Sequence, residues 1–177
     1  AKPFFQAAAL IKKARPAIKI VVPAVPALRA RIEQIARECG VLDALTIVTG
    51  QSHSVLAACD VTLIASGTAT LEAALFKRPM VISYHMHPIS WRLMRRKQLQ
   101  PWVGLPNILC REFVVPELLQ DAATPDALAT AVQDWLDARL QDPARIQRLE
   151  QRFTALHDDL QRDTPRLAAH AIQNLLA

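Results

Sequence analysis

The amino-acid sequence predicts an α/β fold in which helices cover both faces of a doubly wound parallel sheet. Short apolar runs rich in Val and Ile alternate with amphipathic stretches along the first half of the chain. Each run is almost continuously apolar, which is typical of strands buried on both faces. The chain has 177 residues and is 51% hydrophobic, so it can form one sizeable core. Ligands of such folds bind at the carboxyl ends of the strands.

The elements follow in order along the chain. Pro26 suits the first turn of a helix, and Gly40 suits the position just beyond its end. An α/β unit ordinarily begins with a strand, whereas this sequence opens on a helical stretch, so we expect the first strand of the sheet to lie outside it. We expect helices at residues 4–14, 26–39, 53–59 and 68–76, and strands at residues 18–22, 45–48, 61–64 and 80–84.

The pattern changes after Gln100. Residues 101–107 have the composition of an irregular connection, and helical stretches follow at residues 125–140, 143–163 and 165–176. Proline lies in the first turn of each of these three stretches. We therefore expect a Rossmann-like domain at residues 1–124. A helical segment at residues 125–177 would pack on its own chain or on a partner chain.

Composition narrows the classes of function. The sequence has 21 Lys and Arg against 16 Asp and Glu, a net charge of +5, which favours anionic partners. Nucleic acid is not expected, because the sequence has neither a recognisable binding module nor an aromatic stacking platform. No apolar run approaches the ~20 residues that span a bilayer, and the first residues lack the apolar region of a signal peptide.

The cysteines bear on the cellular compartment. Cys39, Cys59 and Cys110 are odd in number and form no Cys-x-x-Cys pair. We therefore expect reduced, buried thiols in a cytoplasmic protein, with neither disulfides nor a metal site.

The most informative segment is residues 65–72, Ala-Ser-Gly-Thr-Ala-Thr-Leu-Glu, which follows a predicted strand and opens the next helix. Free backbone N–H groups and the helix dipole make such an opening a site for a phosphate or diphosphate. Gly67 lets a ligand approach closely because it has no Cβ, and the hydroxyl groups of Ser66 and Thr68 add donors.

Glu72 lies one helical turn beyond Thr68 on the same face. Its carboxylate can accept two hydrogen bonds from the hydroxyl groups of a ribose. Hydrogen-bond donors for a phosphate, followed by an acceptor for ribose hydroxyl groups, are the pattern of a nucleotide site. The alternative is an ordinary capped turn with Thr68 as the N-cap, because short motifs also occur by chance.

Two histidines, His85 and His87, follow the strand predicted at residues 80–84. No acidic or cysteine partner lies nearby in the sequence. We therefore expect solvated or ligand-facing histidines rather than a metal site.

Residues 89–97, Ile-Ser-Trp-Arg-Leu-Met-Arg-Arg-Lys, combine large apolar side chains with four cations. At helical spacing, Trp91 can rest at the headgroup level of a membrane while Arg92, Arg95 and Arg96 contact lipid phosphates. The alternative is a helix packed by Trp91 and Leu93, with solvated arginines. The sequence does not separate these two interpretations.

Two further segments carry polar side chains. Asn107 lies in a proline-led turn, where its amide can bind a base, sugar or phosphate, or can stabilise its own turn. Arg111, Glu112 and Glu117 carry alternating charge near a predicted helix start, for which a surface ion pair is the default expectation.

Taken together, these segments resemble the carboxyl-terminal half of the lipid-A-disaccharide synthase family of inverting, GT-B-type glycosyltransferases. The resemblance covers nearly the whole chain and is strongest from Gly50 to Gln120. Ser-Gly-Thr followed by Glu is shared by many GT-B enzymes, whereas Leu-Pro-Asn and Pro-Glu-Leu-Leu-Gln in this order are much more specific. The matching segments are residues 58–60, 65–72, 77–81, 84–88, 103–109 and 115–120.

The resemblance implies a hexosyltransferase of lipid A (lipopolysaccharide) biosynthesis. Such an enzyme transfers 2,3-diacylglucosamine from its UDP-linked form to 2,3-diacylglucosamine 1-phosphate and releases UDP. Residues 1–124 would then be the donor-binding domain, with a UDP-linked donor, a lipid acceptor and an anionic membrane surface as partners. The resemblance implies no metal or other cofactor, and a cytoplasmic location at the periphery of the inner membrane.

The resemblance also assigns roles within the site. The implied nucleotide-binding residues are Ser66, Gly67, Thr68 and Ala69 for the diphosphate, Glu72 for the ribose, Gly50 and Gln51 with Ser52 for the uracil, and Asn107. Trp91, Arg92, Arg95 and Arg96 would contact the membrane, since both substrates carry acyl chains.

The sequence departs from the family at two places. The Leu-Pro-Gly-Ser-Arg segment and the acceptor domain are absent, and the expected general base belongs to that missing half. No catalytic residue is therefore named, and we expect the isolated chain to bind UDP weakly without turnover. Arg111-Glu112-Phe113 stands where we expect Gly, a basic residue and Glu, so no role is carried onto Glu112.

Two other functions and one question of assembly stay open at this point. The chain can belong to another UDP-sugar GT-B enzyme, such as an epimerase, or be a non-catalytic basic α/β module that binds anionic membranes. The last helices, which follow Pro143 and Pro165, can exchange with a second copy to form a homodimer. The acyl-chain preference is not encoded in any motif that we recognise.

Overall fold

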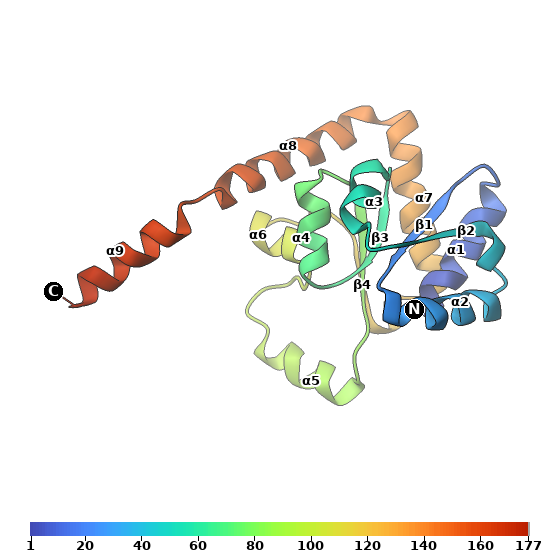
Figure 1. The fold of residues 1–177 in the computed structure, drawn as a ribbon, viewed down its shortest axis with the longest axis horizontal. Coiled ribbons are helices and arrows are strands. Elements are labelled where there is room, and N and C mark those ends of the chain that lie inside the picture. Colours follow the sequence, from blue (N-terminus) through green and yellow to red (C-terminus); the bar gives the residue numbers. More distant parts are fainter. Residues whose placement is uncertain (177) are drawn as a thin grey trace.

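The computed structural model describes residues 1–176, which fold into parallel strands surrounded by helices (Figure 1). The strands are β1 (Ile20–Ala24), β2 (Leu45–Thr49), β3 (Thr62–Ala65), β4 (Met80–Tyr84) and β5 (Glu117–Leu119). The α-helices are α1 (Lys2–Ala14), α2 (Arg29–Glu38), α3 (Ser52–Ala58), α4 (Thr68–Leu75), α5 (Pro88–Lys97), α6 (Leu105–Cys110), α7 (Pro125–Gln141), α8 (Pro143–Leu160) and α9 (Thr164–Leu176). Single 3-10 turns lie at Pro26–Leu28, Leu42–Ala44 and Gln120–Ala122.

The strands form two parallel sheets rather than one. β1 pairs with β2, and β4 lies between β3 and β5, with every pairing parallel. The predicted α/β fold with parallel strands is confirmed. A groove of about 590 Å³ separates β1 from β3 and is lined largely by apolar side chains of α1, α3 and these strands.

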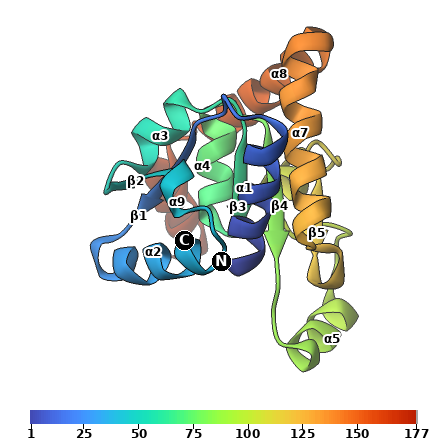
Figure 2. The same cartoon turned by 90° about the vertical axis from the view of Figure 1, so that its right-hand side faces the viewer.

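Helices lie on both faces of the larger sheet (Figure 2). α7 packs against β3 and β4 on one face and also against α1, whereas α4 packs against the same strands from the other face, beside α3. The strand β4 is the centre of the core, because Met80, Val81 and Ile82 are fully buried. The indole Nε1 of Trp135 in α7 donates a hydrogen bond to the carbonyl oxygen of Met80 at 3.2 Å, which fixes α7 to the sheet.

Two elements differ from the sequence-based expectation. β5 has only three residues and includes Glu117, so it lacks the long apolar run that marked the other strands. The Leu-Pro-Asn segment is the start of the short helix α6 rather than an irregular turn, because Pro106 occupies its first turn, where a missing N–H costs nothing. The other predicted strands and helices are present, with ends shifted by a few residues.

Two helices project from the body of the fold. α5 stands on a loop at the carboxyl end of β4, and α9 extends away from the rest of the chain beyond α8 (Figure 1). Every described residue of α9 is exposed, including Leu167, Ile172 and Leu175. The segment at residues 125–176 is therefore not uniform, because α7 and α8 contribute to the core and α9 does not.

None of the helices within residues 1–176 combines the length and apolar character needed to cross a bilayer.

Candidate functional site

The turn between β3 and α4 presents free backbone donors at the carboxyl edge of the sheet. Gly67 is the N-cap residue of α4 and has φ +153° and ψ −169°, a backbone conformation that side chains disfavour. Within the described chain, the N–H groups of Thr68 and Ala69 make no backbone hydrogen bond, as expected for a first helical turn. Gly67, Thr68 and Ala69 are all exposed, so a ligand can reach these donors.

The cap geometry distinguishes this turn from the ordinary alternative. Thr68 is the first residue of α4 rather than its N-cap, and no side chain caps the helix. The hydroxyl of Thr70 instead donates to the carbonyl oxygen of Gly67 at 2.7 Å, which stabilises the turn from inside. The helix opening is thus left uncapped toward solvent, where an anion can occupy it.

Glu72 lies one turn further along α4 and contacts a side chain from α3. The Nε2 atom of His53 lies 3.2 Å from the Glu72 Oε2 atom, and the His53 ring lies 5.7 Å from the ring of Phe76. The Glu72 side chain stays 42% exposed, so its carboxylate can still accept hydrogen bonds from a ligand. This contact brings the predicted ribose acceptor next to the loop that follows β2.

That loop carries the residues expected at the base of the nucleotide. Gly50 has φ +65° and donates its N–H to the carbonyl oxygen of Ala24 at 3.3 Å, and Gln51 begins the turn into α3. Both residues are exposed. The structure therefore brings the segments at residues 50–53 and 66–72 to the same edge of the fold, through the contact between His53 and Glu72. Sequence reasoning missed His53, although it follows directly on the Gly-Gln-Ser segment.

A cluster of polar groups around Glu117, partly or fully buried, supports the turn between β3 and α4. The carboxylate of Glu117 in β5 accepts hydrogen bonds from the N–H groups of Val103 at 2.8 Å and Gly104 at 3.0 Å. It also accepts one from the Asn107 amide at 2.7 Å. The hydroxyl of Ser66 in turn donates to the carbonyl oxygen of Val103 at 3.4 Å. Glu117 thus fixes the backbone on which the Ser66 side chain rests.

This arrangement corrects the expectation for Glu117. The carboxylate does not form a surface ion pair, because it is directed at backbone and amide donors inside the fold. Glu112 does form such a pair, with Arg152 at 3.1 Å. Arg111 ends α6 in the left-handed region, with φ +53°.

Asn107 has a different surrounding from the one its motif suggests. Its side chain is fully buried, its Oδ1 accepts hydrogen bonds from the N–H groups of Val114 and Val115, and its amide donates to the Val115 carbonyl and to Glu117. These four bonds occupy both the oxygen and the nitrogen of the amide. In this arrangement Asn107 supports the fold around Glu117, and its side chain would have to release one of these bonds to contact a nucleotide.

A second side chain after β5 fixes the loop that follows β4. The amide of Gln120 accepts a hydrogen bond from the Met86 N–H at 2.7 Å and donates one to the Met86 carbonyl oxygen at 3.0 Å. His85 and His87 flank Met86 and are exposed, as expected for solvated or ligand-facing side chains. The Nδ1 atom of His87 accepts the Ile89 N–H at 3.4 Å and thereby caps α5.

The predicted membrane contacts all lie on α5. Trp91 is half-buried, whereas Arg92, Arg95 and Arg96 are exposed. Ile89 and Leu93 are also exposed, at 74% and 58%, so the apolar side of this helix is not packed in the described chain. The alternative of a helix packed by Trp91 and Leu93 is therefore wrong for Leu93 and holds only for Trp91, which Met94 joins as a half-buried residue.

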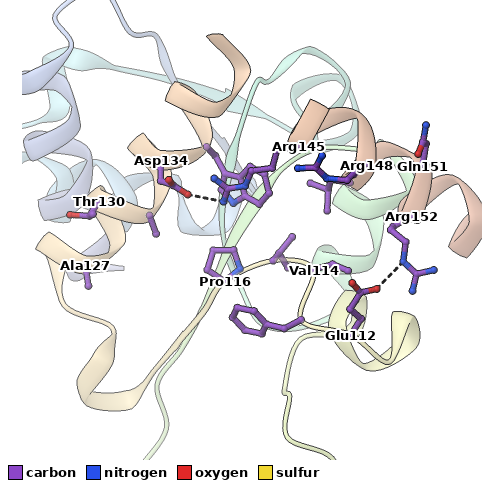
Figure 3. A pocket seen from close by; sticks show the side chains of 15 residues that line it. Glu112, Val114, Pro116, Ala127, Thr130, Asp134, Arg145, Arg148, Gln151 and Arg152 are labelled. Atoms are coloured by element: carbon purple, nitrogen blue, oxygen red, sulfur yellow. Dashed lines mark hydrogen bonds and ion pairs between the residues drawn. The ribbon is translucent and has the colours of Figure 1, made fainter. Parts of the chain in front are cut away.

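A cavity of about 890 Å³ lies elsewhere, between the loop at residues 112–116, α7 and α8 (Figure 3). Its cations already have partners: Arg145 lies 4.1 Å from the Trp135 ring centre and 2.7 Å from Asp134, and Arg152 pairs with Glu112. None of the residues predicted for nucleotide binding lines this cavity. Its size alone therefore does not make it the nucleotide site.

The three cysteines, Cys39, Cys59 and Cys110, carry free thiols that are only partly buried, whereas the sequence led us to expect buried ones. Burial raises the pKa of the Cys59 thiol, and it raises the pKa of the Cys110 thiol in the same way. Residues 1–176 contain no group of three or more His, Cys, Asp or Glu side chains placed to hold a metal ion.

Comparison with known proteins places these features in a family. Residues 1–172 match the family model described as lipid-A-disaccharide synthetase. The chain is 73% identical over 173 residues to a protein of Albidiferax ferrireducens named lipid-A-disaccharide synthase, covering 98% of this chain and 44% of that protein. It is 70% identical over 177 residues to the protein of the same name from Verminephrobacter eiseniae, covering 100% of this chain and 46% of that protein.

More distant relatives give the same result. The Thiobacillus denitrificans protein of this name is 51% identical over 173 residues, covering 97% of this chain and 45% of that protein. The chain therefore spans slightly less than half the length of the curated relatives that it matches. With the family model matching almost all of its residues, the chain belongs to the lipid-A-disaccharide synthetase family.

Proposed function

We propose that this chain is the UDP-donor half of a lipid-A-disaccharide synthase. The full enzyme transfers 2,3-diacylglucosamine from its UDP-linked form to 2,3-diacylglucosamine 1-phosphate, with inversion at the transferred sugar and release of UDP. Family membership supports this reaction, as do the names of the related proteins. The observation that carries the proposal is the meeting of the uncapped α4 turn, Glu72 and the loop after β2 at one edge of the fold.

Each part of the site has a role in binding the donor. The N–H groups at the start of α4 hold the diphosphate together with the hydroxyl groups of Ser66 and Thr68. For this the Ser66 hydroxyl exchanges its 3.4 Å bond to the Val103 carbonyl oxygen for one to a phosphate oxygen. Glu72 accepts hydrogen bonds from the ribose hydroxyl groups, and the backbone at Gly50 and Gln51 faces the uracil. These donors also stabilise the negative charge that develops on the departing UDP, which lowers the barrier without proton transfer.

His53 gives this site a partner for Glu72 before the nucleotide arrives. The imidazole orients the carboxylate through Oε2 and leaves the other oxygen for a ribose hydroxyl. The general base of the reaction is assigned to the half of the enzyme outside this chain. We therefore propose that the chain alone binds UDP weakly and does not turn over.

The helix α5 is proposed to contact the membrane that holds the lipid substrates. Its exposed Ile89 and Leu93 lie one turn apart, and Arg92 and Arg96 form a parallel cationic row beside them. Such a helix rests in the interface with its apolar row inserted and its cations on lipid phosphates. This supports a cytoplasmic enzyme at the periphery of the inner membrane.

The split sheet bears on how the donor half is completed. The groove between β1 and β3 lies between two parallel sheets, and each facing strand offers an unpaired edge. A further parallel strand in this groove would join the sheets into one. We propose that the longer polypeptide of the enzyme supplies it, and that residues 1–124 are the donor domain.

Assembly of the enzyme is proposed to use the last helix. The apolar side of α9 packs on nothing in the described chain, and Leu167 and Ile172 on this helix are exposed. Covering them on a second copy by exchange of α9 gives a homodimer. The alternative, packing on another part of the same polypeptide, gives a monomer whose mass distinguishes the two.

An assay of the full-length enzyme tests the reaction. The enzyme is given UDP-linked diacylglucosamine with diacylglucosamine 1-phosphate, and the products are followed by mass spectrometry, with UDP-N-acetylglucosamine as the donor in a parallel reaction. A disaccharide phosphate formed only from the acylated donor supports the proposal. Epimerised UDP-sugar, or transfer from the unacylated donor alone, contradicts it.

A further inference from the structure

A second cavity lies beside α5, at the same edge of the sheet as the proposed donor site. It has a volume of about 530 Å³ and lies between α5 and the ends of β4 and β5, where His85 and Gln120 line it. This volume falls within the ~300–1,000 Å³ that is usual for small-molecule sites. The cavity is thus a concave site of its own rather than part of a flat helix surface.

The charge of its wall favours an anion. Arg92, Arg95 and Arg96 line the cavity from successive positions on one side of α5, and Asp121 is its one acidic lining residue among the described residues. None of the three arginines forms an ion pair with an acidic side chain of residues 1–176. Like charges three or four residues apart on a helix repel, so a bound dianion relieves this repulsion.

The wall opposite the arginines is fixed in place. The Gln120 side chain, which lines the cavity, is held by its two hydrogen bonds to the backbone of Met86. Trp91, half-buried on α5 beside the arginines, provides a flat apolar surface of the kind on which sugar rings rest. A planar guanidinium group binds the oxygens of a phosphate or a carboxylate in pairs, which favours an anion over a neutral sugar. Three such groups on one helix favour the doubly charged phosphate over the singly charged carboxylate.

The other side of α5 borders an apolar groove. This groove has a volume of about 570 Å³ and is lined by Leu93, Met94 and Trp102. A ligand with a phosphate in the cationic cavity can therefore place an acyl chain along the same helix. An anion site beside an apolar groove matches the chemistry of a phosphorylated lipid.

The order of the strands places the cavity and the donor site at the same edge of the sheet. Strands β3, β4 and β5 are neighbours in that order, and parallel strands lie ~4.8 Å apart, so the ends of β3 and β5 are about 10 Å apart. The diphosphate turn follows β3, whereas the cationic cavity lies at the ends of β4 and β5. Two substrates bound at these places would therefore approach each other along one edge of the sheet.

Resting on the proposed function, we propose that the cavity formed by Arg92, Arg95, Arg96 and Gln120 binds the phosphomonoester of the lipid-sugar acceptor. The donor half of the enzyme then positions both substrates. The arginines of α5 select an acceptor that carries a phosphate, in addition to their contact with the membrane.

Binding of glucosamine 1-phosphate to the purified protein tests this site. Calorimetric titrations compare the wild-type chain with a double variant, Arg92→Gln and Arg96→Gln. The control, Lys2→Gln and Lys13→Gln, removes the same charge from exposed positions that line neither the cavity nor the apolar groove. We expect saturable binding that weakens about tenfold or more in the arginine variant and less than twofold in the control, because charge-assisted hydrogen bonds are lost only in the first. Unphosphorylated glucosamine should not bind.

Three further measurements distinguish the acceptor phosphate from a lipid headgroup and from free phosphate, and distinguish the cationic cavity from the donor site. Phosphatidylcholine vesicles with and without phosphatidylglycerol report on headgroup contact. If the arginine variant loses only vesicle binding and keeps its affinity for glucosamine 1-phosphate, the proposed site is overturned. The site is also overturned if the wild-type chain binds inorganic phosphate and glucosamine 1-phosphate with equal affinity and the arginine variant weakens both equally.

UDP is titrated in parallel on every variant. Unchanged UDP affinity with weakened sugar-phosphate binding supports two separate subsites. If UDP does not bind the wild-type chain while glucosamine 1-phosphate still depends on the arginines, the donor-site proposal fails and the cationic subsite stands.

Discussion

The imidazole of His53 and the carboxylate of Glu72 come from two different helices and meet at 3.2 Å. α3 follows β2 and α4 follows β3, so the contact joins the two loops that the family resemblance assigns to the uracil and to the diphosphate. A carboxylate between these loops lies where the ribose of a nucleotide connects base and phosphate. The contact therefore supports one continuous nucleotide site rather than two unrelated turns.

Removal of the Glu72 carboxylate is the first prediction. Glu72→Ala should weaken UDP binding about tenfold or more, because hydrogen bonds to a charged group contribute about 1.5–3 kcal/mol. Calorimetric titration measures the change. Glu33→Ala is the control, since Glu33 has similar exposure and pairs with Arg29 away from the site. Equal UDP affinity in both variants would contradict the assignment of Glu72 to the ribose.

Replacement of Asn107 should act on stability. Asn107→Ala removes four hydrogen bonds and leaves the N–H groups of Val114 and Val115 without an acceptor. We expect a loss of about 2–4 kcal/mol in the free energy of unfolding, because an unsatisfied buried polar group costs about 1–3 kcal/mol. Urea unfolding followed by circular dichroism measures it. If the urea midpoint is unchanged and only UDP binding is weakened, Asn107 contacts the ligand rather than stabilising the fold.

Gly104 is a position where an added side chain would force two neighbouring side chains to move. A Cβ there would lie 2.4 Å from the Ile82 Cδ1 atom and 2.9 Å from the Glu117 Oε1 atom. Gly104→Ala should therefore cost about 1–3 kcal/mol through overpacking and should loosen the backbone under Ser66. The urea midpoint gives the stability, and Gly40→Asn is the control, since nothing lies near Gly40 and Asn tolerates its φ of +66°. A destabilisation no larger than that of the control would disprove the packing argument.

The raised pKa values of Cys59 and Cys110 predict slow alkylation. Burial favours the neutral thiol, so the reactive thiolate is scarcer in the folded chain than in the unfolded chain at the same pH. Because the pKa of each thiol is higher in the folded chain, its contribution to the free energy of unfolding is fully present below pH 9.0, the ordinary pKa. That contribution is lost as the pH rises through the higher pKa of the folded chain. Site-resolved mass spectrometry after iodoacetamide treatment at several pH values measures the rates. Identical pH–rate profiles for folded and urea-unfolded chain would refute the prediction.

Local pattern was sufficient for most of the fold. The strand β4 lies at residues 80–84 as expected, because its continuous apolar run between Pro79 and the histidine loop has few other interpretations. β5 was missed, since three residues that begin with Glu117 carry no such run. The division into two sheets also escaped prediction, because strand pairing depends on contacts that are distant in sequence.

The candidate site was predictable where its atoms are backbone donors. The turn at Ser66 and Gly67 is encoded in adjacent residues, and the structure leaves its N–H groups exposed. The roles of Asn107 and Glu117 were not predictable, because their partners lie in separate segments that meet only in the folded chain. Polarity in a sequence marks an important residue, but it does not say whether its partner is a ligand or the backbone.

The central claim is that this chain binds UDP between the α4 turn and the loop after β2. A residue-resolved NMR titration of UDP into the isotope-labelled chain, with CMP and phosphate as controls, tests it most directly. We predict saturable shifts of the amide signals of residues 50–53 and 66–72 with UDP, weaker shifts with CMP, and loss of this response in Glu72→Ala. Saturable shifts confined to other residues, or none at all in a folded chain, would contradict the claim.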